Sequence, residues 1–371
     1  MKFKIKQLFK MMCQHIIFPF IYFINRWKKV DKRLVVLADA HHNSCPPHMM
    51  EMRNALYNRD FKVEEFFFDL EELTPWEGFK KMVSFMALYP SCKVVVICDY
   101  FLPVASCNKK KKTKVIQLWH GCGAFKKFGY NAKEDIPLNY KGNVFENNDI
   151  ITVSGDACVR FFSMAMQAGG RVFPVGVSHT DRLFNQEYIE QCKDMLRYEY
   201  PDSAGKKIIL WAPTFRGNAS NPSMAGELYI DNLIAENKFC MDVFIIKSPH
   251  PHLSDGKNRM TTDELIACAD VLVTDYSSVF FEYLIMDKPI VFFAPDFEDY
   301  YADRGFYLDY EDLPGDIITG SDDAEKRLVE AITTAFISDP LADRRRLYRL
   351  EYMSKCDGYA TSRIIDRYMM R

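Results

Sequence analysis

No pair of cysteines in this sequence is spaced as C-x-x-C, although the chain of 371 residues contains 11 cysteines. An odd number of scattered thiols argues against a disulfide framework and indicates reduced cysteines in a cytosolic protein. An excess of one charge sign is also missing, because the net charge at pH 7 is only −2. Such a chain gives no reason to expect a nucleic-acid partner. Its length favours two domains.

The sequence also lacks an apolar run of about 20 residues, the length that spans a bilayer as a helix. The nearest approach is residues 16–24, which Pro19 interrupts and which lysines and arginines flank on both sides. Cationic residues beside aromatic ones favour a segment that lies in the headgroup layer of an anionic membrane. We therefore expect residues 1–33 to attach the protein peripherally to the cytoplasmic face of the membrane. The alternative is a helix that packs on the protein's own surface.

Short apolar runs alternate with helical patterns through the rest of the chain. The first set comprises residues 34–38, 61–69, 93–98, 114–118, 149–154 and 171–177, and the second comprises residues 207–211, 243–247, 271–274 and 289–293. Strands that alternate with helices indicate parallel sheets covered on both faces. Two such series predict an α/β protein with two doubly wound, Rossmann-like domains that face a cleft. We place these domains at residues 34–180 and 181–371, and we expect residues 324–338 and 341–370 to be helical.

The most informative segment is W-H-G-C-G-A-F-K-K-F-G at residues 119–129. His120 follows the predicted strand 114–118, and open α/β sheets place their ligands at the carboxyl ends of strands. A histidine there can accept a proton from an attacking hydroxyl at neutral pH. The glycines after it allow the backbone to approach a substrate. His120 is thus a candidate general base, although a single histidine also suits a structural role.

Two further segments follow strands of the second series. Arg216 ends W-A-P-T-F-R, and an arginine at a strand end can bind phosphate through two parallel hydrogen bonds, unless it only lies on the surface. His250 belongs to K-S-P-H-P-H at residues 247–252, which also suits a phosphate. No carboxylate or cysteine stands at a usual ligand spacing from these histidines, so no metal site is predicted.

The fourth segment, T-D-Y-S-S-V-F-F-E-Y at residues 274–283, runs from a predicted strand into a predicted helix. Free backbone N–H groups and the hydroxyls of Ser277 and Ser278 at the helix start suit an anion. One of these serines can at the same time cap the helix. Glu282 lies about one turn further on, where it can accept hydrogen bonds from ribose hydroxyls.

Taken together, the four segments resemble the CDP-glycerol glycerophosphotransferases of teichoic acid synthesis. Members of that family carry W-H-G followed by lysines, then P-T-[FW]-R, a histidine–proline pair after a strand, and D-Y-S-S followed by an acidic residue and K-P. This chain has all of them in that order, with Lys288 and Pro289 as the K-P pair and D-Y-E-D-L-P-G at residues 309–315. The resemblance covers roughly residues 34–365.

The resemblance implies a glycosyltransferase-B-like fold with the donor nucleotide on the second domain. It implies transfer of glycerol phosphate or ribitol phosphate from CDP-glycerol or CDP-ribitol, with CMP released and no tightly bound cofactor. The acceptor is then a hydroxyl of a lipid-linked saccharide or polyol phosphate. The family pattern makes His120 the general base. It assigns the donor pyrophosphate to Arg216, His250, Ser277 and Ser278, the ribose to Glu282, and the acceptor side to Gly121, Lys126, Lys127 and Asp181.

The sequence departs from the family pattern on the acceptor side. The usual T-P-L-K after W-H-G is replaced at residues 122–126, and the usual G-Y-P-R-N-D by G-V-S-H-T-D at residues 176–181. The loop H-H-N-S-C-P-P-H at residues 41–48 brings three histidines and a cysteine, which suit zinc or, as we favour, acceptor binding. Two other functions fit the same residues: a nucleotide-sugar transferase or epimerase of the same fold, and a non-catalytic nucleotide-binding membrane scaffold.

Overall fold

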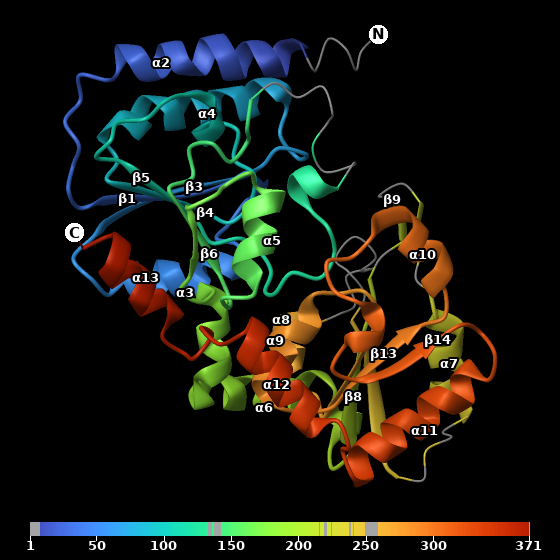
Figure 1. The fold of residues 1–371 in the computed structure, drawn as a ribbon. Coiled ribbons are helices and arrows are strands. Elements are labelled where there is room, and N and C mark those ends of the chain that lie inside the picture. Colours follow the sequence, from blue (N-terminus) through green and yellow to red (C-terminus); the bar gives the residue numbers. More distant parts are fainter. Residues whose placement is uncertain are drawn as a thin grey trace. The chain divides into compact units, whose positions relative to one another are not determined.

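The structure is a computed structural model that describes residues 8–132, 136, 142–214, 216–218, 221–223, 225–236, 239, 241–248 and 259–370, the side chains of residues 216–218, 221–223 and 301–304 excepted. The chain forms two compact units. Unit 1 comprises Met1–His120, Phe128–Asp181 and Lys355–Arg371, and unit 2 comprises Gly121–Lys127 and Arg182–Ser354. Both units are α/β folds, as Figure 1 shows.

Unit 1 is built on a seven-stranded sheet in the order β2-β3-β1-β4-β5-β6-β7. Its strands are β1 (Leu34–Asp39), β2 (His41–His42), β3 (Lys62–Asp69), β4 (Val94–Ile97), β5 (Lys114–Gln117), β6 (Ile150–Val153) and β7 (Val172–Pro174). All neighbours are parallel except β2 and β3. The strand order reverses between β1 and β4, and such a switch point is where open α/β sheets bind ligands.

Helices cover both faces of this sheet. They are α2 (Phe18–Ile24), α3 (Met50–Tyr57), α4 (Pro75–Leu88), α5 (Cys158–Ala165) and α13 (Ala360–Tyr368). In Figure 1, α2 and α4 lie on one face of the sheet and α3 and α13 on the other. Strand β1 is buried on both faces, because Val36 packs with Phe18 and Phe85, whereas Leu37 packs with Leu56 and Ile364. A parallel strand buried on both faces explains the unbroken apolar run that predicted it.

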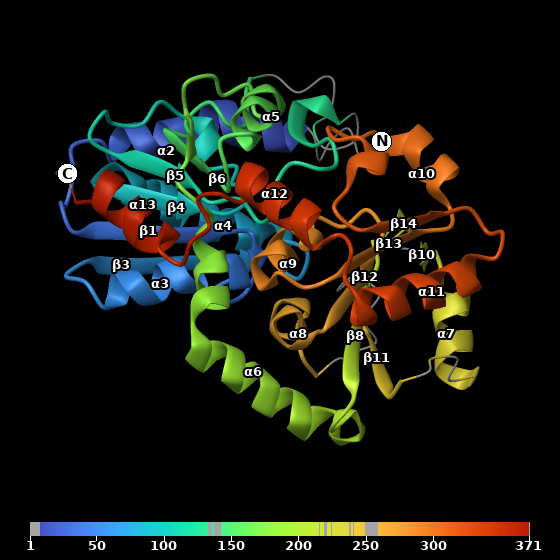
Figure 2. The same ribbon diagram turned by 60° about the horizontal axis from the view of Figure 1, so that its bottom comes forward.

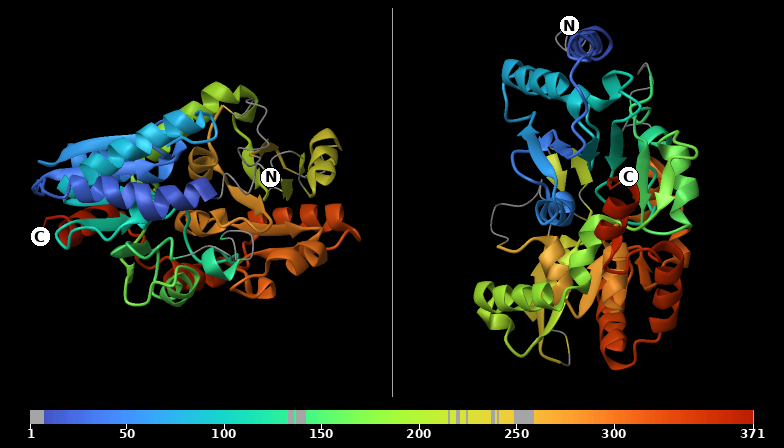
Figure 3. Two further views of the ribbon diagram at one scale, coloured as in Figure 1. Left: turned by 90° about the horizontal axis from the view of Figure 1, so that it is seen from above. Right: turned by 90° about the vertical axis from the view of Figure 1, so that its left-hand side faces the viewer.

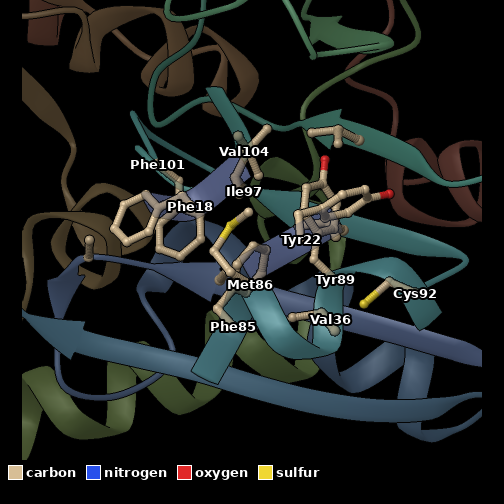
Figure 4. Close-up of a cluster of buried hydrophobic side chains, with 14 of the residues drawn as sticks. Phe18, Tyr22, Val36, Phe85, Met86, Tyr89, Cys92, Ile97, Phe101 and Val104 are labelled. Atoms are coloured by element: carbon tan, nitrogen blue, oxygen red, sulfur yellow. The ribbon is translucent and has the colours of Figure 1, made fainter. Parts of the chain in front are cut away.

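The amino-terminal helix packs on unit 1 through one of its faces. Residues 8–12, a π-helical turn at Cys13–Ile17 and α2 follow one another without a break. Phe18 and Tyr22 are buried in the same cluster as Phe85 and Tyr89, as Figure 4 shows. This part of the segment therefore packs on the protein, as the alternative interpretation predicts. The opposite face is exposed and apolar.

Unit 2 is built on a five-stranded parallel sheet in the order β11-β8-β12-β13-β14. Its strands are β8 (Lys207–Ala212), β11 (Val243–Lys247), β12 (Val271–Thr274), β13 (Ile290–Ala294) and β14 (Asp316–Thr319), with a short antiparallel pair of β9 (Arg216–Asn218) and β10 (Asn221–Ser223) beside them. The order again reverses next to its first strand, between β8 and β12. The predicted doubly wound pattern is thus confirmed for both sheets.

The helices of unit 2 are α6 (Gln186–Glu199), α7 (Glu227–Glu236), α8 (Thr262–Cys268), α9 (Val279–Tyr283), α10 (Phe297–Arg304), α11 (Ala324–Ile337) and α12 (Ala342–Tyr352). Figure 2 shows α7 and α11 on one side of the strands and α8 on the other. Ile230 of α7 and Leu328 of α11 pack on Trp211 and Val273 of the sheet. No helix among the residues that the structure describes is long and apolar enough to cross a bilayer.

The carboxyl-terminal segment differs from the sequence-based expectation. Residues 341–370 are helical over α12 and α13, as predicted, but the chain leaves the helix after α12 and turns at Gly358, whose φ is +87°. Helix α13 then packs on unit 1, where Ile364 and Ile365 are buried beside Leu37. The predicted domain 181–371 thus loses its last part, Lys355–Arg371, to unit 1. The reason is that the apolar face of α13 completes the core under β1.

Candidate active site

His120 lies just beyond the carboxyl end of β5, in unit 1. The backbone turns sharply before it, because Trp119 has a φ of +62°, a strained conformation for a bulky residue. Gln117 holds this turn, since its side-chain oxygen accepts the Trp119 N–H at 3.0 Å. The Trp119 ring stacks on the imidazole with ring centres 4.4 Å apart. The turn therefore fixes the direction of the His120 side chain, which is 45% exposed.

Asp99 pairs with this histidine, and the sequence analysis did not identify it. Its Oδ2 lies 3.3 Å from the His120 Nδ1, and its side chain is 26% exposed. Burial raises the pKa of the Asp99 carboxyl, but the hydrogen bond and charge of His120, the charge of His41 and the Tyr100 N–H together lower it more, so that the pKa lies below its ordinary value. Gln117 also donates to the Asp99 carbonyl at 3.1 Å. The available signal was the position of Asp99, two residues after the end of β4, because β4 and β5 are neighbouring strands.

The segment after His120 packs in unit 2. The Lys127 N–H donates to Gly305 O at 3.3 Å, and the Tyr307 N–H donates to Phe125 O at 2.8 Å. Gly123 adopts a φ of +64°, and a Cβ there would lie 2.2 Å from the Phe281 ring. Position 123 therefore requires glycine, because the backbone packs closely on α9. Lys126 and Lys127, predicted on the acceptor side, lie beside the segment from Gly305 to Tyr307 in the unit that carries the Ser277–Ser278 turn.

The Ser277–Ser278 turn joins β12 to α9, as predicted. Ser277 Oγ accepts the Val279 N–H at 3.4 Å, while the Ser278 side chain makes no capping bond. A Cβ on Gly121 would lie 3.5 Å from Ser278 Oγ, so the backbone of the W-H-G segment passes close to this serine. Glu282 is on α9 and is 8% exposed. The geometry brings Gly121 and the turn together within unit 2.

Asp275 ties two of the predicted motifs together. It is 2% exposed, and its Oδ1 accepts the N–H groups of Thr214 at 2.7 Å and Tyr276 at 2.6 Å. Thr214 belongs to the P-T-F-R segment, so the carboxylate links the loop after β8 to the loop after β12. These are the two loops at the switch point of the second sheet. Asp275 therefore positions the candidate donor site without having been predicted.

Two predicted phosphate ligands are not defined by the structure. Arg216 begins β9, where its backbone pairs with Ser223, but its side chain is outside the described residues. His250 also lies outside them. Lys247, which was considered with them, forms ion pairs with Glu227 and Asp231 of α7. Both Arg216 and His250 stay predictions.

Asp181 supports a helix. Its two carboxylate oxygens accept the N–H groups of Ala360 at 3.0 Å and Thr361 at 2.7 Å, at the first turn of α13. Burial raises the pKa of Asp181, although these hydrogen bonds act in the opposite direction. A carboxylate at a helix start is favourable for the helix. The residue predicted for the acceptor side thus holds α13 on unit 1.

The histidine-rich loop follows β1 at the switch point of the first sheet. Asp39 Oδ2 lies 2.8 Å from His42 Nδ1 and accepts the His41 N–H at 2.8 Å. Burial raises the pKa of the Cys45 thiol to about 12, so this cysteine is protonated at neutral pH. Zinc binds the thiolate form. The acceptor-side role favoured for this loop stays a prediction.

Comparison with known proteins decides the family. The family model "CDP-Glycerol:Poly(glycerophosphate) glycerophosphotransferase" matches residues 20–369. The chain belongs to this family. The match confirms the resemblance inferred from the four motifs. The protein is therefore an enzyme of the transferase class.

Curated relatives and solved structures agree with this assignment. A teichoic acid ribitol-phosphate primase of Bacillus spizizenii is 33% identical over 307 residues, which cover 76% of this chain and 76% of the primase. A teichoic acid glycerol-phosphate primase of Bacillus subtilis is 32% identical over 248 residues, or 62% of each chain. A structure of the wall teichoic acid polymerase TagF superimposes with a TM-score of 0.73 at 21% identity, covering 92% of this chain and 89% of that one. The last comparison supports the glycosyltransferase-B-like fold.

Proposed function

We propose that this glycerophosphotransferase moves glycerol phosphate or ribitol phosphate from a CDP-polyol to a hydroxyl of a lipid-linked acceptor. CMP is the second product, and the transferred unit becomes part of a teichoic-acid-like cell-wall polymer. The family name supports CDP-glycerol as the donor class, and the primases among the relatives support both polyols.

The chemistry is an in-line displacement at the phosphorus that carries the polyol. The acceptor oxygen forms a bond to this phosphorus as the bond to the CMP phosphate breaks. In the proposal, His120 Nε2 takes the proton of the attacking hydroxyl, because Nδ1 faces Asp99 at 3.3 Å. A carboxylate on one ring nitrogen fixes the tautomer and stabilises the imidazolium that forms. Asp99 therefore acts as a positioning residue for the base.

The donor phosphates are assigned to the turn between β12 and α9. Its serine hydroxyls and the backbone N–H groups at the helix start suit the charge that develops on the leaving CMP. One observation carries the proposal: a Cβ on Gly121 would lie 3.5 Å from Ser278 Oγ, and a peptide bond joins Gly121 to His120. The candidate base is thus one residue from the segment that packs on the candidate anion site. Arg216 and His250 are proposed as further phosphate ligands, and Glu282 as the ribose ligand.

The test is transfer of label from CDP-glycerol and from CDP-ribitol to a lipid-linked acceptor by the purified full chain. His120→Ala should lower kcat by about 10²–10⁴-fold at saturating donor, the usual contribution of a general base. His15→Ala removes a histidine of the amino-terminal helix and serves as the matched control. Undiminished turnover of His120→Ala would reject the base, and absence of transfer from either CDP-polyol by the wild type would reject the function.

We also propose that the amino-terminal helix holds the enzyme on the cytoplasmic face of the membrane. The helix lies along the outer side of unit 1 next to α4 (Figure 3). Its outward residues are large and apolar, and Phe20 and Phe23 are 61% and 69% exposed. These residues are Leu8, Phe9, Met11, Met12, Ile16, Phe20, Phe23 and Ile24, and the exposed Trp27 follows in the turn after the helix. Such a face beside basic residues suits the interface of an anionic bilayer.

The lysine run at residues 109–112 adds charge to the same region. The Lys110 N–H donates to the Tyr22 hydroxyl at 2.8 Å, which places this loop against the amino-terminal helix. Lys111 and Lys112 are exposed. Each basic residue near an anionic surface contributes about 1 kcal/mol of attraction. The loop therefore brings two exposed lysines close to the amino-terminal helix.

Vesicle sedimentation tests this attachment. The double variant Phe20→Ser/Phe23→Ser should bind vesicles with 30% phosphatidylglycerol at least about tenfold more weakly, because two large apolar side chains no longer insert. Leu347→Ser, which removes an exposed apolar side chain of unit 2, is the control. Equal binding of the double variant and the wild type would exclude this helix as the anchor.

A further inference from the structure

The motif D-Y-E-D-L-P-G at residues 309–315 brings a tyrosine to the loop that precedes the candidate anion site. We propose that Tyr310 is a positioning residue, which holds the Ser277–Ser278 turn in the geometry that receives the donor phosphates. The inference rests on the proposed function and adds a residue to its donor site. Tyr310 acts on the turn through the backbone.

A buried hydrogen bond links Tyr310 to the residue after β12. The Tyr310 hydroxyl donates to the backbone carbonyl of Asp275 at 3.2 Å. Asp275 comes directly after β12, and the turn opens two residues later at Ser277. Tyr310 and Asp275 are both 2% exposed, so the bond is shielded from water. Loss of a buried donor is costly, and the hydroxyl therefore fixes the direction of this carbonyl.

The peptide bond between Asp275 and Tyr276 is held at both of its polar groups. Its carbonyl accepts from Tyr310 at 3.2 Å, and its N–H donates to the Asp275 carboxylate at 2.6 Å. The same carboxylate oxygen accepts the Thr214 N–H at 2.7 Å. A planar peptide group held in this way cannot rotate without breaking a buried hydrogen bond. Because Ser277 follows directly, this plane sets the course of the chain into the turn.

Aromatic rings surround Tyr310 and fix the position of its hydroxyl. Its ring centre lies 4.7 Å from that of Phe297, 5.6 Å from that of Tyr276 and 6.1 Å from that of Phe292. These three rings come from α10, from the loop before the turn and from β13. Tyr276 is held as well, because its hydroxyl donates to Asp296 at 3.0 Å. A side chain with so little freedom keeps its partner in one position.

The rest of the motif gives Tyr310 a rigid base. A one-turn 3₁₀ helix begins at Tyr310, and the Asp309 side chain caps it by accepting a backbone N–H at 3.1 Å. A Cβ on Gly315 would lie 2.4 Å from the carbonyl oxygen of Ile290 in β13, so glycine is required where the motif ends. The motif is thus packed against the sheet on both sides of its tyrosine.

Tyr310 also contacts the segment that follows the candidate base. Its ring lies at 29° to that of Phe125, with the ring centres 6.1 Å apart. Phe125 is 2% exposed, and its carbonyl accepts the Tyr307 N–H at 2.8 Å. It belongs to residues 122–126, where the sequence departs from the family pattern. Within unit 2, one side chain therefore touches the segment after His120 and the residue that leads into the anion site.

A purely structural role is the alternative, and the same strand supplies a control for it. Tyr283 is 0% exposed, and its hydroxyl donates to the carbonyl of Ala269 at the same distance of 3.2 Å. Ala269 precedes β12, whereas Asp275 follows it, so two tyrosines hold the two ends of one strand. Only the end held by Tyr310 leads into the turn. A role in stability alone predicts that neither hydroxyl affects donor binding by the folded protein.

The expected size of the effect follows from a shift between geometries of the turn. When the hydroxyl is removed, the turn is free to leave its binding geometry, and the apparent Kd of a ligand rises by the inverse of the fraction that remains in it. One buried hydrogen bond biases such an equilibrium by about five- to tenfold. Tyr310→Phe removes only the hydroxyl oxygen and keeps the ring among its aromatic neighbours.

Binding and steady-state kinetics of the full chain test the inference. Tyr310→Phe should raise the KM of the CDP-polyol and the Kd of CDP about five- to tenfold, while the acceptor KM stays within twofold. Tyr283→Phe should leave all three values within twofold. Each substitution should lower the Tm by no more than about 5 °C, so that folded proteins are compared. Hydrogen exchange of residues 275–279 in the free protein should be faster in Tyr310→Phe alone.

The outcomes separate this inference from the proposed function. If no CDP-polyol is used for transfer but CDP binds more weakly to Tyr310→Phe alone, the proposed function falls and the positioning role stands. If transfer is found but the two variants have equal donor KM values, the function stands and the positioning role is wrong. A wild-type protein that does not bind CDP, or a rise in acceptor KM as large as that in donor KM, would also overturn it.

Discussion

Replacing Asp99 by asparagine tests the geometry of the candidate base most directly. The substitution keeps the shape of the side chain but removes the charge that faces His120 Nδ1. The Asp99 amide can then present either an oxygen or an NH₂ group to the imidazole, so the tautomer with a free Nε2 is no longer favoured. The protein should fold normally, because Asp99 is partly exposed and its backbone contacts remain.

The expected loss follows from the distance and exposure of the pair. Two unit charges 3.3 Å apart interact by about 5 kcal/mol at an effective dielectric of 20 and by about 1.3 kcal/mol in bulk water. The side chains are 45% and 26% exposed, so the lower half of this range applies. A loss of roughly 1.5–3 kcal/mol of transition-state stabilisation corresponds to a fall in kcat of about 10- to 150-fold.

The assay is the pH dependence of kcat at saturating CDP-glycerol and acceptor. Asp99→Asn should lower kcat while the donor KM changes less than twofold, and the acidic limb of the profile should move to lower pH by about one unit, because the imidazolium loses its carboxylate. Asp60→Asn removes a surface carboxylate of the same unit that pairs with Arg33, and it should leave the profile unchanged. A kcat within twofold of the wild type, or an unmoved acidic limb, would refute the role of Asp99.

Other predictions concern stability. Phe18→Ala should lower the free energy of unfolding by about 3–5 kcal/mol, since Phe18 is fully buried, whereas Phe20→Ala should change it by less than about 0.5 kcal/mol; urea unfolding of both variants measures the difference. Asp275→Ala leaves two buried N–H groups without their acceptor and should cost roughly 2–4 kcal/mol, more than Asp275→Asn, in the same measurement. Asp181→Asn should destabilise by about 1–3 kcal/mol and increase hydrogen exchange in α13, because one of its two N–H groups then meets an amide donor. The lowered pKa of Asp99 means that its carboxylate stabilises the folded state above the unfolded pKa of about 4 and loses this contribution as the pH falls through the folded value; Asp99→Asn should therefore unfold with a weaker pH dependence below about pH 4, and an unchanged dependence would contradict the pair.

Most of the regular structure was predictable because its signals are local. The apolar runs of β1, β4 and β12 are unbroken and have polar residues on both sides, so they are recognised as buried parallel strands. The short strand β14 was missed, because Asp316 begins it and only two apolar residues follow. The break between α12 and α13 was missed as well, since the helical pattern resumes after Gly358. Local patterns of this kind do not say on which unit the last helix packs.

The site was predictable in part. The motif histidine and the serine turn were identified, because each follows a strand end and carries a recognisable chemistry. Asp99 and Asp275 were not, since each belongs to one loop and acts on another. Asp181 was assigned to the acceptor side, whereas its carboxylate caps a helix almost 180 residues later in the chain. Such roles depend on which strands are neighbours, and sequence periodicity does not encode strand order.

The amino-acid sequence by itself determined the family, the two α/β series and the candidate base of this protein. These features follow from residue types in a fixed order and from apolar periodicity, both of which are local. Only the tertiary structure decided that Asp99 faces His120, that Asp275 joins two motifs, and that Tyr310 donates to the Asp275 carbonyl. These contacts join residues far apart in sequence, and the packing of whole strands and helices brings them together.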